Sequence, residues 1–217
     1  MSGASKDRGF FISFEGGDGA GKSTQIRMLA ERLRASGREV VLTREPGGSD
    51  GAEAIRKLLL EGAAERWSPL AEALMMYAAR ADHIERTIEP ALARGAVVIT
   101  DRFADSTMAY QGLAGSLGVD VVNALQSLVV KRMPDITFIL DLPVEEGLKR
   151  AAASGVEQRF ESKGAAYHEK VREAFLTIAR TDPLRCAVID ASGSAEEVSV
   201  RIVKEARRRL PNGVLGK

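Results

Sequence analysis

The chain has 217 residues, which is enough for one sizeable α/β domain with its own core. Its 31 Lys and Arg against 30 Asp and Glu leave a net charge of +1, which disfavours a nucleic-acid or membrane-surface binder. The single cysteine, Cys186, excludes an intrachain disulfide, and its apolar surroundings predict a buried thiol. No apolar stretch is long enough to span a bilayer. We therefore expect a soluble cytoplasmic protein, with no nucleic-acid or membrane partner and a flexible polar leader over Met1–Arg8.

The first pattern in chain order joins an apolar run to a glycine-rich segment. Phe10–Phe14 is typical of a buried strand, and apolar residues then recur at helical spacing until Gly37. Between them stands GGDGAGKS, which fits the phosphate-binding loop pattern in its strand–loop–helix context. Backbone N–H groups of such a loop surround nucleotide phosphates. The nucleotide-binding residues predicted here are Gly16, Gly17, Asp18, Gly19, Ala20, Gly21, Lys22, Ser23 and Thr24.

Two side chains of this loop carry the chemistry. Lys22 is placed to reach the β- and γ-phosphates of ATP, and the Ser23 hydroxyl is placed to bind Mg²⁺. The alternative is a glycine-rich turn that binds nothing.

Four further runs rich in β-branched residues predict strands. They are Glu39–Thr43, Ala96–Thr100, Ile136–Leu142 and Ala187–Asp190. Helical patterns lie between them, so we expect right-handed βαβ units and a parallel sheet covered by helices on both faces. Ligands of such a sheet gather at the carboxyl ends of its strands.

Polar residues follow two of these strands. Arg44 begins the segment REPGG after the second strand, and Asp101 and Arg102 follow the third. Arg binds phosphate bidentately, so Arg44 and Arg102 are candidates to clamp a second, monophosphate ligand. Asp101 is placed to hold Mg²⁺ through water. The alternatives are an ordinary Pro-Gly-Gly turn and a surface ion pair.

One predicted helix has an apolar stripe of Leu70, Leu74, Tyr77 and Ala81. By this spacing the stripe belongs to the core, and Arg80 is then an exposed charge. His83 is expected on the surface or in helix packing, because no partner with metal-site spacing is visible. The last helix carries Val198, Ile202, Ala206 and Leu210 behind a capping box of Ser194 and Glu197.

The set EGGDGAGKST, TREPGG, the helix of Arg80, and DRFADSTMAYQG resembles the bacterial thymidylate kinase family. The similarity extends from Phe11 to about Ser192. It implies the P-loop NTPase fold, with a five-stranded parallel sheet, helices on both faces and a short lid at about 150–165 in a single domain over 1–217. It also implies transfer of the γ-phosphoryl of ATP to dTMP with Mg²⁺, and a homodimer.

The resemblance also assigns acceptor contacts. Asp18 matches the carboxylate that takes the sugar 3′-hydroxyl, Arg80 the side chain that hydrogen-bonds the thymine edge, and Tyr110 the residue that crowds C2′. Met76 stands where many members carry a Phe that stacks on the base. The acceptor-binding set predicted in this way is Asp18, Arg44, Pro46, Met76, Arg80, Arg102, Ser106, Thr107, Tyr110 and Gln111.

The family carries its catalytic arginine either in the phosphate-binding loop or in the lid. Here Gly19 occupies the loop position, so the resemblance points to the lid. Arg150 is similar to the residue that packs on adenine, and Arg159 is the candidate for transition-state charge. An ion pair with a neighbouring glutamate is the alternative for Arg159. The predicted catalytic set is Lys22, Asp101, Arg102 and Arg159.

Two other functions compete with this interpretation. A kinase for another nucleotide or nucleoside shares most of these features. A P-loop switch ATPase gives no reason for Arg80 or for the pair Tyr110 and Gln111, and the guanine-specific Asn-Lys-x-Asp string of GTPase switches is not found. A switch hydrolyses ATP alone, whereas a kinase requires a second nucleotide.

Overall fold

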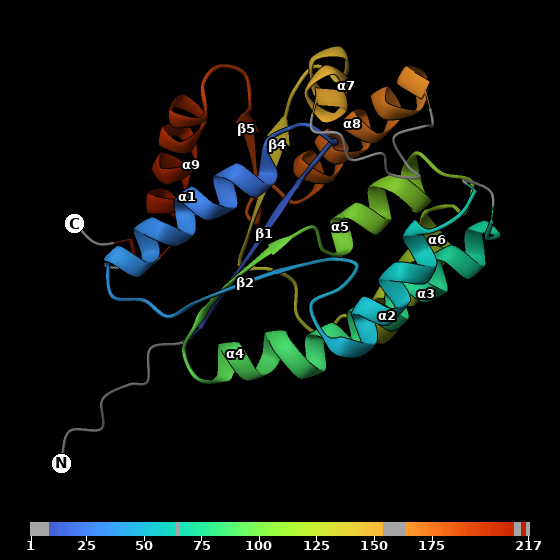
Figure 1. Cartoon of the computed structure of the whole chain (residues 1–217), viewed down its shortest axis with the longest axis horizontal. Helices are drawn as coiled ribbons and strands as arrows, with labels where there is room; N and C mark the ends of the chain where they lie inside the picture. Colours follow the sequence, from blue (N-terminus) through green and yellow to red (C-terminus); the bar gives the residue numbers. More distant parts are fainter. Residues whose placement is uncertain (1–8, 64–65, 154–163, 211–213, 216–217) are drawn as a thin grey trace.

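A five-stranded parallel sheet forms the centre of the computed structural model (Figure 1), which describes residues 9–63, 66–153, 164–210 and 214–215. The strand order is β2-β3-β1-β4-β5. The strands are β1 (Phe10–Gly16), β2 (Val40–Arg44), β3 (Val97–Asp101), β4 (Ile136–Asp141) and β5 (Cys186–Asp190). All five predicted strands are therefore present, and the predicted fold class is confirmed.

The strand bounds differ from the predicted ones by a residue or two. β2 and β3 run one residue further, so that Arg44 and Asp101 are the last residues of their strands and pair in register. β1 continues to Gly16, which places Glu15 inside the sheet and fully buried. The polar residues Glu15, Arg44 and Asp101 are therefore part of the strands and not of the loops that follow them.

Helices cover both faces of the sheet (Figure 1). One face carries α1 and α9, whose apolar residues pack on β1, β3, β4 and β5. The other face packs against α8, α4, α5 and the π-helical segment η2. The helical bounds are α1 (Lys22–Ala35), α2 (Asp50–Leu60), α3 (Pro69–His83), η1 (Ile84–Ile88), α4 (Glu89–Ala93), α5 (Ala104–Thr107), η2 (Met108–Leu113), α6 (Val119–Val129), α7 (Val144–Ala153), α8 (Gly164–Thr181) and α9 (Ala195–Arg209).

Sequence periodicity predicted the buried face of α9 correctly and that of α3 only in part. The predicted stripe of α9 is buried, and the capping box of Ser194 and Glu197 is formed. In α3, Tyr77 is buried as predicted, but Leu70 and Leu74 are each 48% exposed and Ala81 is exposed, whereas Arg80 is buried. The helix turns its polar residues inward, because they pair with other buried polar groups, and leaves its leucines outward.

Two other predictions concern single features. Cys186 is buried in β5 as predicted, and burial raises the pKa of its thiol to about 12. None of the helices in the described ranges is long and apolar enough to cross a membrane. The predicted leader, Met1–Arg8, lies outside the described residues.

Candidate active site

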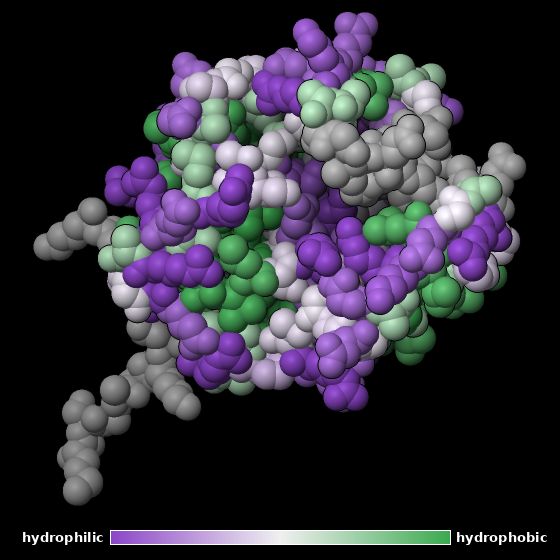
Figure 2. Space-filling model, in the orientation of Figure 1, coloured by the Kyte–Doolittle hydropathy of each residue, from purple (hydrophilic) through white to green (hydrophobic). Residues whose placement is uncertain are grey.

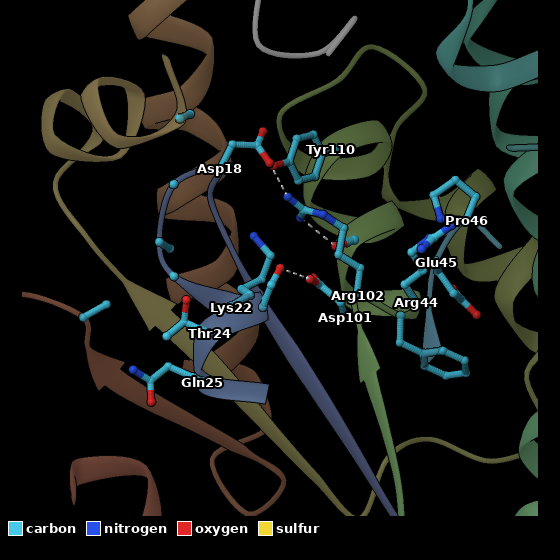
Figure 3. A pocket seen from close by; sticks show the side chains of 18 of the residues that line it. Asp18, Lys22, Thr24, Gln25, Arg44, Glu45, Pro46, Asp101, Arg102 and Tyr110 are labelled. Atoms are coloured by element: carbon cyan, nitrogen blue, oxygen red, sulfur yellow. Dashed lines mark hydrogen bonds and ion pairs between the residues drawn. The ribbon is translucent and has the colours of Figure 1, made fainter. Parts of the chain in front are cut away.

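A cavity of about 600 Å³ opens at the carboxyl ends of β1, β2 and β3. In the space-filling view the hollow near the middle of this face is lined mostly by hydrophilic residues (Figure 2). Three groups of predicted residues line it, from the phosphate-binding loop, from the REPGG segment and from the segment after β3. Figure 3 shows these groups facing one another across the cavity.

The phosphate-binding loop connects β1 to α1. Gly21 has φ of 88°, in the left-handed region that favours glycine, and α1 begins at the next residue. The Lys22 ammonium donates to the carbonyl oxygens of Gly16 at 3.1 Å and Gly17 at 2.8 Å. Burial of Lys22, followed by the positive charge of Arg102, lowers the pKa of its ammonium. The loop is thus shaped as a cradle with one cation held inside it.

Gly19 is constrained by its conformation and by its neighbour. Its φ is 73°, and a Cβ on it would overlap the carbonyl oxygen of Gly147 in α7. An arginine at this position would therefore require α7 to move. The close packing gives a physical reason why this loop carries no arginine there.

Two oxygen-bearing side chains meet beside the loop. The Ser23 hydroxyl donates to Asp101 Oδ2 at 3.0 Å (Figure 3). A hydroxyl and a carboxylate are hard oxygen ligands of the type that Mg²⁺ prefers, and Mg²⁺ sites of this kind are completed by phosphate oxygens and water. Ser23 and Asp101 therefore fit the predicted metal site.

Arg102 projects from the end of β3 toward the loop. Its guanidinium donates to Asp18 Oδ1 at 2.6 Å, and to Gly16 O and Ser106 Oγ at 3.2 Å each. It also lies 5.1 Å from the centre of the Tyr110 ring. The backbone of Arg102 has φ of 71°, which is unusual for a residue with a side chain and is typical of functional positions. Burial raises the pKa of the Asp18 carboxyl, but the charges of Arg102 and Lys22 outweigh it and leave that pKa lowered.

Glu15 is a buried carboxyl beneath Arg102, and sequence reasoning assigned it no role. Its Oε1 accepts from the backbone N–H of Phe103 at 2.7 Å, and its Oε2 accepts from Ser106 Oγ at 2.5 Å. Burial, reinforced by the nearby Asp105, raises the pKa of Glu15 to about 8. Glu15 therefore ties the segment after β3 to the end of β1.

The REPGG segment supplies the opposite wall of the cavity. Arg44 is half-exposed and donates to both carboxylate oxygens of Glu53 at 3.2 Å. Arg56 of α2 donates to Pro46 O at 2.6 Å and also lines the cavity. Burial, with the charge of Arg44, lowers the pKa of Arg56. Sequence reasoning missed Arg56, because nothing in the pattern of α2 distinguishes it from the other helix charges.

Arg80 is buried at the inner end of the cavity, which corrects the prediction of an exposed helix charge. Its Nε donates to Glu45 Oε2 at 2.7 Å, and its Nη2 donates to Phe103 O at 3.1 Å and Thr107 Oγ1 at 3.0 Å. The rings of Tyr77 and Phe103 lie 4.9 and 5.4 Å from the guanidinium carbon. Nη1 is buried and has no hydrogen-bond partner in the part of the chain that the structure describes. Arg80 is thus held by three acceptors, and the hydrogen-bonding capacity of Nη1 is unused among the described residues.

The remaining predicted acceptor residues lie around this end of the cavity. Gln111 Nε2 donates to Glu72 Oε1 at 2.9 Å. Met76, Thr107 and Tyr110 also line the cavity. The structure therefore brings together all ten predicted acceptor-binding residues at one cavity.

The predicted lid is described only at its two ends. Residues 150–153 end α7, and residues 164–165 begin α8. Arg150 pairs with Glu146, donates to Ala191 O at 3.5 Å and lines the cavity. Arg159 lies outside the described residues.

The strand order, the phosphate-binding loop after β1 and the arginine-lined subsite beside it together define a P-loop kinase, which is a phosphotransferase. The sequence profile described as thymidylate kinase matches residues 14–202. Among curated relatives, thymidylate kinase of Caulobacter vibrioides is 60% identical over 94% of this chain and 98% of that protein. Thymidylate kinase of Bradyrhizobium sp. is 53% identical over 94% of this chain and 92% of that protein. The crystal structure of thymidylate kinase from Ehrlichia chaffeensis superposes with a TM-score of 0.76 at 35% identity, covering 91% of this chain and 98% of that one. The chain belongs to the thymidylate kinase family.

Proposed function

We propose that this protein transfers the γ-phosphoryl group of ATP to dTMP and releases dTDP and ADP. The observation that carries the proposal is the pairing of a phosphate-binding loop with a buried arginine, Arg80, which lines the same cavity and has one nitrogen without a hydrogen-bond partner among the described residues. A nucleoside monophosphate offers a phosphate at one end and a base with hydrogen-bond acceptors at the other. The cavity offers cations for the first and Arg80 for the second.

The donor nucleotide is assigned to the phosphate-binding loop. Its backbone N–H groups and the N-terminus of α1 favour the phosphates of ATP, and Lys22 neutralises charge on the transferring group. Ser23 and Asp101 would hold Mg²⁺. A bound Mg²⁺ would offset the negative charge of the β- and γ-phosphates.

The acceptor phosphate is assigned to Arg44 and Arg102, with Arg56 as a further cation on the same wall. Holding the acceptor oxygen in line with the γ-phosphate is the main contribution of such a site, because phosphoryl transfer needs little covalent chemistry from the protein. Asp18 is assigned to the sugar 3′-hydroxyl, and its pairing with Arg102 at 2.6 Å links sugar recognition to the phosphate clamp.

The base and the deoxyribose are assigned to the inner end of the cavity. Arg80 Nη1 donates to a carbonyl of thymine, and Gln111 and Thr107 lie near the base edge. The Tyr110 ring is assigned to the space beside C2′, which disfavours a ribose hydroxyl. Met76 takes the place of a stacking ring, since a thioether also makes favourable contacts with aromatic faces.

Residues at about 150–165 are assigned to a lid over ATP. Arg150 lines the cavity beside the carbonyl of Ala191, where its plane is available to pack on adenine. Arg159 remains the proposed transition-state cation, because the phosphate-binding loop has Gly19 and no arginine at the corresponding position. A side chain there would overlap the carbonyl oxygen of Gly147.

We also propose a cytoplasmic homodimer. The homodimer is supported by exposed apolar side chains on α2, α3 and α6, a region where Figure 2 shows hydrophobic residues at the margin of the molecule. α3 packs against both α2 and α6, and a contiguous exposed apolar patch typically marks an interface. The exposed apolar side chains are Leu58, Leu70, Leu74, Val121 and Leu128.

An ADP-release assay tests the activity. The protein is supplied with ATP, Mg²⁺ and, in separate reactions, dTMP, dUMP, dCMP or ribosylthymine monophosphate. We expect dTMP to give the largest stimulation over ATP alone. A different preferred acceptor would indicate a kinase for another nucleotide, and ADP release that ignores every acceptor would indicate a switch ATPase.

A further inference from the structure

Glu45 is a buried carboxylate with both oxygens in use. Its Oε2 accepts from Arg80 Nε at 2.7 Å, and its Oε1 lies 3.0 Å from His83 Nδ1. The other ring nitrogen of His83 lies 2.7 Å from Thr43 Oγ1. The backbone N–H of Glu45 donates to Asp101 O at 2.9 Å, which ties the residue to the end of β3. Glu45 is therefore held from three directions.

The hydrogen-bond chain has a definite polarity. A carboxylate only accepts, so His83 Nδ1 carries a hydrogen and donates a hydrogen bond to Glu45 Oε1. In the neutral imidazole, Nε2 then accepts from the hydroxyl of Thr43. Since His83 is fully buried, water does not compete for these bonds. The carboxylate of Glu45 is thus oriented from the side opposite Arg80.

Because Arg80 is buried, its guanidinium needs the negative charge of the Glu45 carboxylate beside it. Only 3% of Arg80 is exposed, and its other partners, Phe103 O and Thr107 Oγ1, are neutral. A buried guanidinium without a counter-charge is costly, and it relaxes toward any other acceptor. Such a rotation would move Nη1, the nitrogen without a hydrogen-bond partner in the described part of the chain.

We propose that Glu45 is the positioning residue that aims Arg80 Nη1 at the acceptor base, with His83 and Thr43 holding the carboxylate in place. This inference rests on the proposed recognition of dTMP. Because Arg44 ends β2 and Glu45 follows it directly, one short stretch of chain sets both ends of the acceptor site, the phosphate clamp and the base-reading donor. This contact would favour a base with a carbonyl at C4, as in thymine, over a base with an amino group at C4, as in cytosine.

The experiment measures dissociation constants of dTMP and dCMP by titration calorimetry, and the KM of ATP in the kinase assay. The variants are Glu45→Gln, which removes the charge, and Glu45→Asp, which keeps the charge but retracts it by one methylene. The matched control is Glu39→Gln, because Glu39 accepts from Arg94 Nε at the same 2.7 Å but lies exposed, just before β2. Thermal unfolding is recorded for each variant.

We expect both Glu45 variants to weaken dTMP binding by on the order of 10- to 100-fold, because small displacements of an orienting group have effects of this size. The dCMP affinity and the KM of ATP should stay within about twofold, so the ratio of the two dissociation constants falls. If Glu45→Gln does not fold, Glu45→Asp, which retains the buried charge, gives the same test. A wild-type ratio in a folded Glu45 variant would overturn the proposal.

Arg80→Met separates this proposal from the assignment of Arg80 itself. We expect it to abolish the preference for dTMP over dCMP, and adding Glu45→Gln to it should weaken dTMP binding no further, since Glu45 acts through Arg80. A further loss of dTMP affinity in the double variant would show that Glu45 acts by another route. An unchanged preference in Arg80→Met would refute the base-reading role of Arg80 and with it the proposed acceptor assignment. A lost preference in Arg80→Met beside a wild-type preference in the Glu45 variants would refute only the positioning role.

Discussion

Replacement of Arg102 by alanine tests the division of the cavity into donor and acceptor subsites. The guanidinium of Arg102 is linked to Asp18 at 2.6 Å, and its side chain is 18% exposed. Its removal takes away a cation from the acceptor phosphate and leaves the Asp18 carboxylate without its arginine partner. We therefore expect dTMP binding to suffer from both a lost attraction and a new repulsion.

The expected size follows from the burial of this pair. Removing one partner of a buried, hydrogen-bonded charge pair costs about 2–5 kcal/mol. At about 1.4 kcal/mol for each factor of ten, this range corresponds to roughly 30-fold to several thousandfold in dTMP affinity. ATP affinity should change by less than about threefold, because the proposed contacts of Arg102 are with the acceptor.

The assay measures the dissociation constants of both nucleotides for wild type, Arg102→Ala and Arg102→Lys. Lysine keeps the positive charge but cannot donate two parallel hydrogen bonds, so the loss of dTMP affinity in Arg102→Lys should be intermediate. Arg94→Ala is the matched control, because Arg94 also pairs with a carboxylate at 2.7 Å but lies on the surface. Equal losses of dTMP and ATP affinity in Arg102→Ala would refute the acceptor-clamp role.

Three further predictions concern the loop, the lid and the carboxyl beneath the site. Lys22→Ala should remove nearly all turnover without changing the circular dichroism spectrum, because Lys22 meets the transferring group. Arg159→Ala should lower kcat by roughly a thousandfold with little change in the dTMP KM, whereas Arg150→Ala should raise the ATP KM. Glu15 has a pKa of about 8 in the folded protein, above its ordinary value of 4.5, so its stabilising contribution is present at acid pH and is lost as the pH rises toward 8. The melting temperature of wild type should therefore fall relative to that of Glu15→Gln between about pH 5 and pH 8.

Each of these has an outcome that contradicts it. Substantial turnover in Lys22→Ala would remove Lys22 from the mechanism. A near-normal kcat for Arg159→Ala beside a collapsed kcat for Arg150→Ala would exchange the two lid roles. A constant difference in melting temperature between wild type and Glu15→Gln across that pH range would show that Glu15 does not hold its proton more tightly in the fold.

The sequence predicted the strands and the outline of the site because both depend on local patterns. The loop of Lys22 stands between a clear strand and a clear helix, and Arg44 and Asp101 end β-branched runs whose carboxyl ends meet at one edge of the sheet. The parallel arrangement then brings these residues together. A local pattern and one rule of sheet geometry were sufficient for this part.

The buried charges could not be predicted in the same way. Glu15, Glu45 and Arg80 look like surface residues in the sequence, since a charged residue reveals its burial only through partners distant along the chain. The face of α3 was predicted only in part for the same reason: Tyr77 is buried as predicted, but Leu70 and Leu74 are exposed while Glu72, Arg80 and His83 are buried. Periodicity finds the inner face of a helix only when that face is apolar.

The central claim, phosphoryl transfer from ATP to dTMP, is tested most directly by following the phosphoryl group itself. The protein is incubated with γ-labelled ATP, Mg²⁺ and dTMP, and the labelled products are separated, with Lys22→Ala as the parallel control. The account predicts that the label appears in dTDP with wild type and that almost no labelled dTDP forms with Lys22→Ala. Label found only in inorganic phosphate, at a rate independent of dTMP, would contradict it.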